Sequence, residues 1–220
     1  MRRLLDILFP PRADGLLLRD VTPNDFCGKC APQLVGATRP ATATLFSYAD
    51  PVARAAIHEA KYHGSEHAFS LLAAALADFL PDYLAEHGAF SNVGRTTSYI
   101  SIVPVPLGAA RRKERGFNQV EEVARRALCS LGEENVINIL LDASLLARVR
   151  ETPSQVSLER AAREKNMRDA FGVAHSPDPA RLYIILDDVL TTGATLQACL
   201  DALVAAGIPR DHLLPIALAH

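Results

Sequence analysis

One segment, Tyr183-Ile184-Ile185-Leu186-Asp187-Asp188-Val189-Leu190-Thr191-Thr192-Gly193-Ala194-Thr195-Leu196, carries the strongest structural signal in the chain. Its first four residues are apolar and predict a strand buried on both faces. The apolar run then stops at two adjacent carboxylates, where a buried strand reaches the edge of its sheet. Small, hydroxyl-rich residues follow, and a helix begins near Leu196 and is closed by Gly207 and Pro209. The segment therefore predicts a strand, an acidic pair, a turn and a helix N-terminus.

This order of elements suits an anionic sugar. Backbone N–H groups and the positive end of the helix favour a phosphate, and threonine hydroxyls add uncharged donors. Ionised Asp187 and Asp188 only accept hydrogen bonds, so vicinal hydroxyls or a hydrated cation are their natural partners. The segment thus predicts an anion site with a sugar clamp beside it.

Other phosphate-binding motifs do not fit the spacing. A Walker A loop requires a lysine that is absent here, and a dinucleotide fingerprint requires Gly-x-Gly, a spacing that none of the 12 glycines has. The plain structural alternative is a strand followed by a turn that caps a helix. The segment resembles the ribose-5-phosphate-binding signature of the type I phosphoribosyltransferases. The resemblance implies that Asp187 and Asp188 hold the ribose hydroxyls of phosphoribosyl pyrophosphate. It also implies that a loop wraps the 5-phosphate: Thr191, Thr192, Gly193, Ala194 and Thr195.

The composition describes an ordinary globular protein. With 220 residues, 49% of them hydrophobic, the chain supports one sizeable core with extensions or at most two small domains. A net charge of -2 argues against a globally basic nucleic-acid binder but allows a local basic patch. The richest apolar run, Leu71 to Ala77, is broken at Asp78, so we expect no membrane span. Four scattered cysteines make no disulfide scaffold, which favours a reducing, cytoplasmic location.

Residues 1–42 are rich in proline and glycine, lack sustained periodicity, and predict a short irregular extension before a main domain at 43–220. The extension contains Cys27-Gly28-Lys29-Cys30, which is half of a zinc ribbon. Structural zinc requires four ligands, and Cys129 and Cys199 lie in helical patterns typical of small buried side chains. We therefore expect no complete zinc site within one chain. A turn with two reduced thiols, or pairing of two such turns across a homodimer, remains as an alternative.

Strand and helix patterns alternate along the main domain. Apolar or alternating runs predict strands at 42–48, 99–103, 136–141, 183–186 and 213–218. Helical spacing predicts helices at 51–60, 65–80, 120–129 and beyond 196, the first with Asp50 as its N-cap. Such alternation predicts an α/β fold with a mostly parallel sheet and helices on both faces.

Two clusters of cations lie outside the acidic segment. One is Arg111-Arg112-Lys113-Glu114-Arg115, between a strand and a helix, and the other surrounds Thr152-Pro153-Ser154-Gln155 with Arg148, Arg150, Arg160 and Arg163. A run of charge is usually a solvated face. The first cluster, however, lies where α/β proteins place their ligands, at the carboxyl edge of a strand.

Several blocks in order resemble the ComF family of competence-associated, phosphoribosyltransferase-like proteins. The blocks are Lys61-Tyr62, Val103-Pro104-Val105-Pro106-Leu107, Arg115-Gly116-Phe117-Asn118-Gln119, Thr152-Pro153-Ser154-Gln155 and the acidic segment. The resemblance covers about residues 43–220 and implies a type I phosphoribosyltransferase fold. Many members open with a four-cysteine zinc ribbon, whose first pair is replaced here by Ala13-Asp14-Gly15-Leu16.

Two functions follow from this resemblance. The first is a phosphoribosyltransferase that uses Mg²⁺ with phosphoribosyl pyrophosphate and an unidentified acceptor, with Asp187, Asp188, Arg115 and Lys61 as catalytic residues. The pyrophosphate would then contact Lys61, Arg111, Arg112, Arg115, Arg150 and Arg163. The second is a non-catalytic module whose basic loops bind single-stranded DNA and serve the DNA-uptake machinery. An aromatic content of 6% without tryptophan leaves few stacking platforms, so we favour donor binding with a role in DNA uptake.

Overall fold

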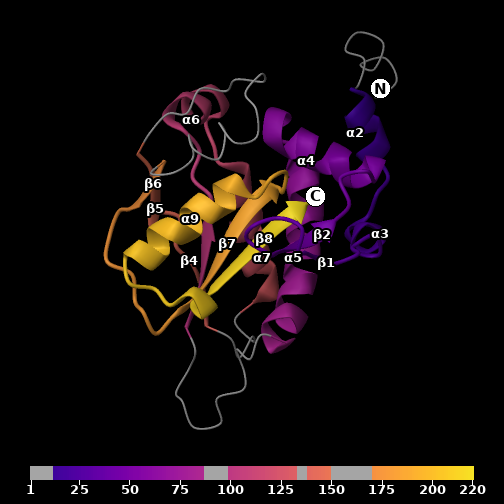
Figure 1. The fold of residues 1–220 in the computed structure, drawn as a ribbon. Helices are drawn as coiled ribbons and strands as arrows, with labels where there is room; N and C mark the ends of the chain where they lie inside the picture. Colours follow the sequence, from indigo (N-terminus) through magenta and orange to yellow (C-terminus); the bar gives the residue numbers. More distant parts are fainter. Residues whose placement is uncertain (1–11, 87–98, 133–137, 150–169) are drawn as a thin grey trace.

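The computed structural model describes residues 12–86, 99–132, 138–149 and 170–220. At its centre is a six-stranded sheet of order β1-β2-β8-β7-β3-β4 (Figure 1). All neighbouring strands are parallel except β1, which pairs antiparallel with β2. The strands are β1 (Gln33–Val35), β2 (Thr42–Phe46), β3 (Ile100–Pro104), β4 (Ile139–Leu141), β7 (Leu182–Val189) and β8 (Leu213–Ala219). The mostly parallel sheet is confirmed.

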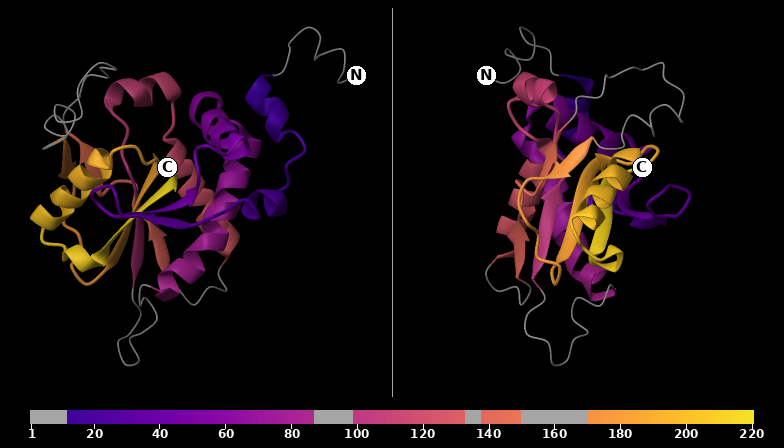
Figure 2. Two further views of the ribbon diagram at one scale, coloured as in Figure 1. Left: turned by 45° about the vertical axis from the view of Figure 1, so that its right-hand side comes forward. Right: turned by 60° about the vertical axis from the view of Figure 1, so that its left-hand side comes forward.

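Helices cover both faces of this sheet, as predicted (Figure 2). The helices α4 (Pro51–His63), α5 (Glu66–Glu86) and α7 (Gln119–Leu131) lie on one face, and α9 (Ala194–Ala205) lies on the other. Successive side chains of a strand point to opposite faces of the sheet, so β7 contributes side chains to the hydrophobic cores on both faces. Ile184 packs into the core under α5 and α7, whereas Ile185 packs against Leu196 and Leu200 of α9.

The helix α4 is longer than predicted. Asp50 caps it as expected, because its Oδ1 accepts hydrogen bonds from the backbone N–H of Val52 (2.8 Å) and Ala53 (2.9 Å). The predicted end at 60 is wrong, since the helix continues to His63 and closes on Gly64 in the left-handed region (φ 58°). Lys61 therefore lies in the last helical turn rather than in a loop.

The prediction of an irregular N-terminal extension is wrong for residues 13–35. This segment forms α2 (Ala13–Leu18), α3 (Pro23–Cys27) and the edge strand β1. The helix α3 is short but has a reciprocal capping box between Thr22 and Asp25. Leu18 and Phe26 are fully buried in the main core, so the extension shares that core.

The sequence predicts that no apolar run approaches the length of a membrane span, and α5 is an exception to this prediction. Among the described residues it is the one helix long and apolar enough to cross a membrane by length and composition. Within its apolar window, 56% is buried inside the protein. It lies against α7, α4 and α3, so the same apolar residues that give it this composition form the core of the α/β fold.

The remaining elements are short. A separate antiparallel pair consists of β5 (Leu146–Arg148) and β6 (Phe171–Val173), and neither strand was predicted. The helix α6 (Ala109–Arg115) contains the basic run, and η1 (Arg210–His212) precedes β8. Cys199 is buried in α9 as predicted, but the prediction for Cys129 is wrong because its side chain is exposed on α7.

Candidate functional site

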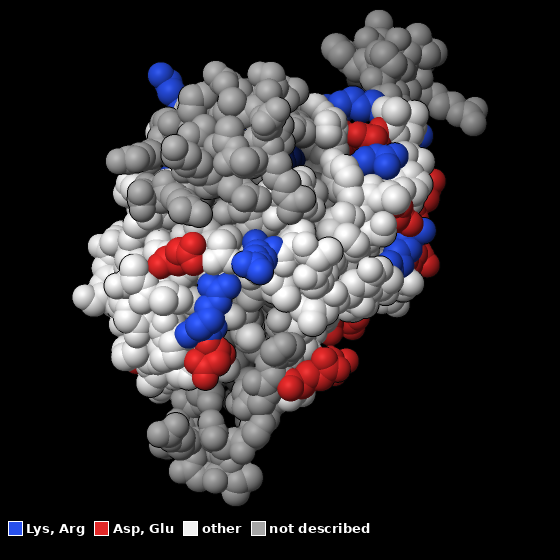
Figure 3. All heavy atoms as spheres, viewed as in Figure 1, with Lys and Arg blue, Asp and Glu red and all other residues white. Residues whose placement is uncertain are grey.

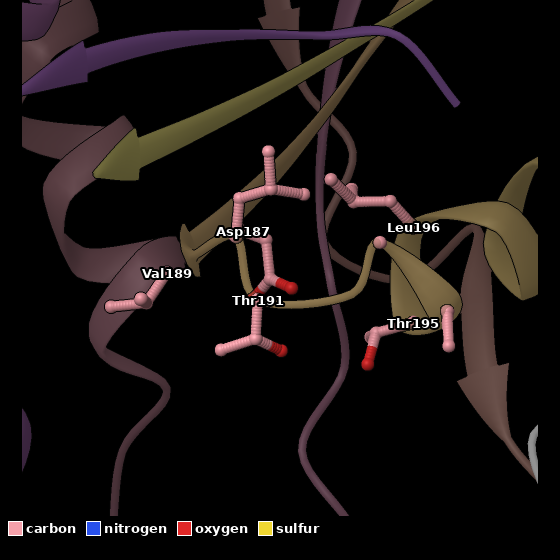
Figure 4. A pocket seen from close by; sticks show the side chains of 8 residues that line it. Asp187, Val189, Thr191, Thr195 and Leu196 are labelled. Carbon is pink, nitrogen blue, oxygen red and sulfur yellow. The ribbon is translucent and has the colours of Figure 1, made fainter. Parts of the chain in front are cut away.

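The carboxyl end of β7 borders a small pocket that is open to solvent (Figure 4). Its lining comes from the end of β7, the following loop and the first turn of α9: Asp187, Val189, Leu190, Thr191, Gly193, Ala194, Thr195 and Leu196. The oxygen atoms of Asp187, Thr191 and Thr195 are turned toward the same open space. A helix N-terminus, hydroxyl groups and one carboxylate therefore converge, as the sequence predicts.

Gly193 is required by the shape of this loop. It is the N-cap of α9 and adopts φ 78°, in the left-handed region. A Cβ atom there would lie 2.7 Å from the carbonyl oxygen of Arg39, on the segment that precedes β2. The loop is thus pressed against residues 38–40, which fixes the backbone N–H groups at the start of α9.

The two aspartates are not equivalent. The prediction that the strand stops before them is wrong: β7 continues to Val189, so the two side chains point to opposite faces of the sheet. Asp187 faces α9 and lines the pocket, whereas Asp188 faces α4 and α7 and is 8% exposed. Desolvation and, second, the charge of Asp188 raise the pKa of Asp187 to about 7, although the Asp188 N–H donates to its Oδ1 (2.9 Å).

Asp188 is already held by three donors. Its Oδ2 lies 2.6 Å from Nζ of Lys61 and accepts a 2.8 Å hydrogen bond from Nε2 of Gln119. Its Oδ1 accepts a 2.8 Å hydrogen bond from the backbone N–H of Val189. Lys61 comes from the end of α4 and Gln119 from the start of α7, so Asp188 joins three elements at one point.

Arg115 is connected to this cluster through Gln119. Its Nη1 donates a 3.1 Å hydrogen bond to Oε1 of Gln119, and its guanidinium lies 5.1 Å from the centre of the Tyr62 ring. Asn118 fixes the turn between α6 and α7: its Oδ1 caps Val120, and its Nδ2 donates to the carbonyl of Val105 after β3.

The structure therefore brings together part of the predicted site. The pocket is lined by Asp187 and by four of the five predicted loop residues, Thr191, Gly193, Ala194 and Thr195. Thr192 is not among the lining residues, and its hydroxyl accepts a hydrogen bond from the backbone N–H of Ala194 (3.4 Å). Lys61 contacts Asp188 directly, and Arg115 reaches it through Gln119. Arg111 and Arg112 lie on exposed positions of α6, and Arg112 faces Glu121 at 3.9 Å. Arg150 and Arg163 lie outside the described residues.

Gln119 was missed as a site residue, and Tyr62 was predicted only as a candidate platform for stacking a nucleic-acid base. Both residues belong to sequence blocks that resemble the ComF family, and this was the one feature of the sequence that pointed to a role for them in the site. The sequence does not show that their partners lie on other elements.

Charge on the molecular face drawn in Figure 3 is mixed. Lysine and arginine side chains alternate there with aspartate and glutamate among the described residues. Among the described residues visible in this view, no single-sign basic patch of the kind that follows a nucleic-acid backbone is seen.

The Cys27–Cys30 turn is compact. The Cys30 N–H donates to the Cys27 carbonyl (2.8 Å), and the Cys30 thiol donates to the Leu45 carbonyl (3.5 Å). Burial raises the pKa of Cys30 to about 11 and also raises the pKa of Cys27. Within the described ranges, no group of three His, Cys, Asp or Glu side chains could hold a metal ion.

We expect purified protein to contain well below one zinc per chain. Two thiols supply half of a tetrahedral shell, and their raised pKa values oppose the thiolate form that zinc binds. Metal analysis of the wild type, of Cys27→Ser and of the exposed-thiol control Cys129→Ser should give the same low content. Stoichiometric zinc that disappears only in Cys27→Ser would contradict this prediction.

The chain is similar in sequence to curated proteins named for competence and DNA utilization. No protein-family model matches it. It is 32% identical over 121 residues to Competence protein F of Haemophilus influenzae, covering 54% of this chain and 50% of that protein. It is 33% identical over 106 residues to DNA utilization protein YhgH of Salmonella typhi and 31% identical to YhgH of Escherichia coli, covering 48% of this chain and 44% of each protein. The chain spans about half the length of the curated relatives it matches. These similarities, together with the residue blocks described above, support the assignment of this chain to the ComF family.

Proposed function

We propose that this protein binds phosphoribosyl pyrophosphate, or a ribose 5-phosphate group, in the pocket at the end of β7. One observation carries the proposal: a carboxylate, hydroxyl groups and a helix N-terminus line the same pocket. The helix N-terminus and the loop Thr191 to Thr195 suit the 5-phosphate. Asp187, as an acceptor beside them, suits the ribose hydroxyls.

The cations gathered around Asp188, at the same end of β7, suit the diphosphate. Lys61 and Arg115 come from different elements and both lie near Tyr62, at 6.0 Å and 5.1 Å from its ring centre. In a phosphoribosyl transfer, these two side chains would neutralise the charge that develops on the departing diphosphate. The cluster contains no group that stands out as a general base, so the proposal leaves the acceptor open.

Magnesium fits this site only together with the ligand. Mg²⁺ in phosphate-handling enzymes is commonly held by one or two carboxylates and by the phosphates of the substrate. Asp187 and Asp188 could supply those carboxylates, and Asp188 has donors on both oxygens already. Asp187 is therefore the better candidate for the metal, whose contribution would be to bind and polarise diphosphate oxygens.

The names of the relatives support a role in DNA uptake. Two of these names are Competence protein F and DNA utilization protein YhgH. We propose that this chain serves a related cytoplasmic process. Direct binding of single-stranded DNA is the second candidate, favoured by the exposed cations Arg111, Arg112 and Lys113 on α6.

Calorimetric titration separates the two candidates. We expect wild-type protein to bind phosphoribosyl pyrophosphate with Mg²⁺, and Arg115→Ala to weaken that affinity far more than the affinity for ribose 5-phosphate. Replacing Arg111, Arg112 and Lys113 by alanine should leave donor binding unchanged, because no described contact joins them to Asp188.

The same variants can be titrated with a single-stranded oligonucleotide at several salt concentrations. Each phosphate contact adds about 0.7 to the slope of log affinity against log salt. If the α6 triple variant lowers that slope by about two units while Arg115→Ala binds the donor normally, the DNA-binding candidate replaces the proposed one.

A further inference from the structure

Gln119 is a buried amide with a charged partner at each end. It is 4% exposed, its Nε2 donates to Asp188 Oδ2 (2.8 Å), and its Oε1 accepts from Arg115 Nη1 (3.1 Å). A carboxylate only accepts and a guanidinium only donates, so the amide can satisfy both in one orientation alone. A buried amide that is hydrogen-bonded at both ends holds its two partners at a fixed distance from each other.

The two partners differ in how firmly the fold holds them. Asp188 lies on the central strand β7 and is fixed by three donors. Arg115 ends α6, a helix without a buried residue, and is followed by Gly116 in the left-handed region. The described contacts of the Arg115 guanidinium are Gln119 and the face of Tyr62.

Gln119 itself is anchored by the start of α7. The preceding Asn118 caps the helix and reaches back to Val105, and the following Val120 is buried in the core. The amide therefore stands on a rigid element between a rigid carboxylate and a weakly supported guanidinium. Lys61 contacts the same oxygen of Asp188 as Gln119 does. The positions of both cations are therefore linked to Asp188 Oδ2, directly for Lys61 and through Gln119 for Arg115.

We infer that Gln119 is a positioning residue, which couples Asp188 to Arg115 so that Arg115 and Lys61 face the diphosphate of the ligand together. This inference rests on the proposed function and deepens it. It also separates two jobs within the site: Asp187 and the threonine loop serve the ribose 5-phosphate, and Asp188 with Gln119 arranges the cations.

The first test compares two ligands in the full chain. Gln119→Leu keeps the approximate size of the side chain and removes both hydrogen bonds. We expect its affinity for phosphoribosyl pyrophosphate with Mg²⁺ to fall about tenfold, as for the loss of one charge-assisted hydrogen bond. Its affinity for ribose 5-phosphate should stay near that of the wild type. Gln33→Leu, on the exposed edge strand β1, is the matched control and should change neither affinity.

The second test needs no ligand. Gln119→Glu places a carboxylate against Asp188 and should lower the melting temperature. Adding Asp188→Asn exchanges the roles of the two side chains, because the amide at position 188 now donates and the carboxylate at position 119 accepts. That carboxylate also keeps one negative charge near Lys61 and Arg115. The double variant should therefore melt well above the sum of the two single changes.

Three outcomes decide the inference. A selective loss of diphosphate affinity with a rescued double variant supports it. Equal affinities in Gln119→Leu and wild type, or additive melting changes, would overturn it. If the wild type binds no phosphoribosyl pyrophosphate, the proposed function fails and the diphosphate role of Gln119 fails with it. The rescue would then show only that residues 119 and 188 are energetically coupled.

Discussion

Alanine at position 193 is expected to abolish high-affinity binding of ribose 5-phosphate and to lower the melting temperature by about 5 °C or more. Two effects add. The left-handed conformation costs a residue with a Cβ roughly 1–2 kcal/mol. The new Cβ would also lie 2.7 Å from the Arg39 carbonyl oxygen, so the loop must move and take the backbone N–H groups of α9 with it. Thermal unfolding and ligand titration of Gly193→Ala measure the two effects.

Gly207→Ala provides the matched control at the other end of α9. Gly207 is also in the left-handed region (φ 96°), but a Cβ there would meet nothing within 4 Å. This variant should lose stability only through the strained left-handed backbone conformation, and it should bind ribose 5-phosphate like the wild type. If both variants bind equally well, the close contact of the loop with residues 38–40 does not shape the phosphate site.

Asp187→Asn is expected to lower the affinity for ribose 5-phosphate about a hundredfold while making the protein more stable at pH 8. At pH 8, above the raised pKa of Asp187, the affinity falls because a neutral amide replaces the ionised carboxylate that faces the ribose hydroxyls, which removes more than one charge-assisted hydrogen bond. Loss of both carboxylates, in Asp187→Ala with Asp188→Ala, should abolish binding with the fold retained. Unchanged affinity in that double variant would disprove the ligand assignment.

The gain in stability follows from the pKa of Asp187. Burial raises this pKa from 3.8 to about 7, so the folded protein keeps a proton that the unfolded chain has lost between these values. Stability therefore falls as pH rises through that window. Asparagine cannot ionise, so the variant should match the wild type near pH 4 and exceed it at pH 8 in denaturant unfolding. Parallel stability curves for the two proteins would contradict the assigned environment of Asp187.

The fold was predictable where its signals are local. The strand at 183–186, the threonine-rich turn and the helix closed near Gly207 are written in consecutive residues, and the structure has them in that order. Asp50 and Pro51 likewise predict the start of α4. The pocket followed from the same segment, because one strand end and one helix N-terminus make it.

Features that depend on distant contacts were missed. Thr22 and Asp25 cap a helix of 5 residues, which is too short to show a helical period, and its stability comes from Phe26 in the core. The separate roles of the aspartates depend on the strand continuing past them to Val189. Gln119 meets Asp188 across 69 residues of sequence, so no local pattern shows that its amide is buried between charges.

A crystal structure of the protein with ribose 5-phosphate would show directly where the sugar phosphate binds. We expect the phosphate at the N-terminus of α9, among Thr191, Gly193 and Thr195, with the ribose hydroxyls toward Asp187. Asp188 should keep its contacts with Lys61 and Gln119. A ligand bound elsewhere on the protein, with this pocket empty, would contradict the central claim.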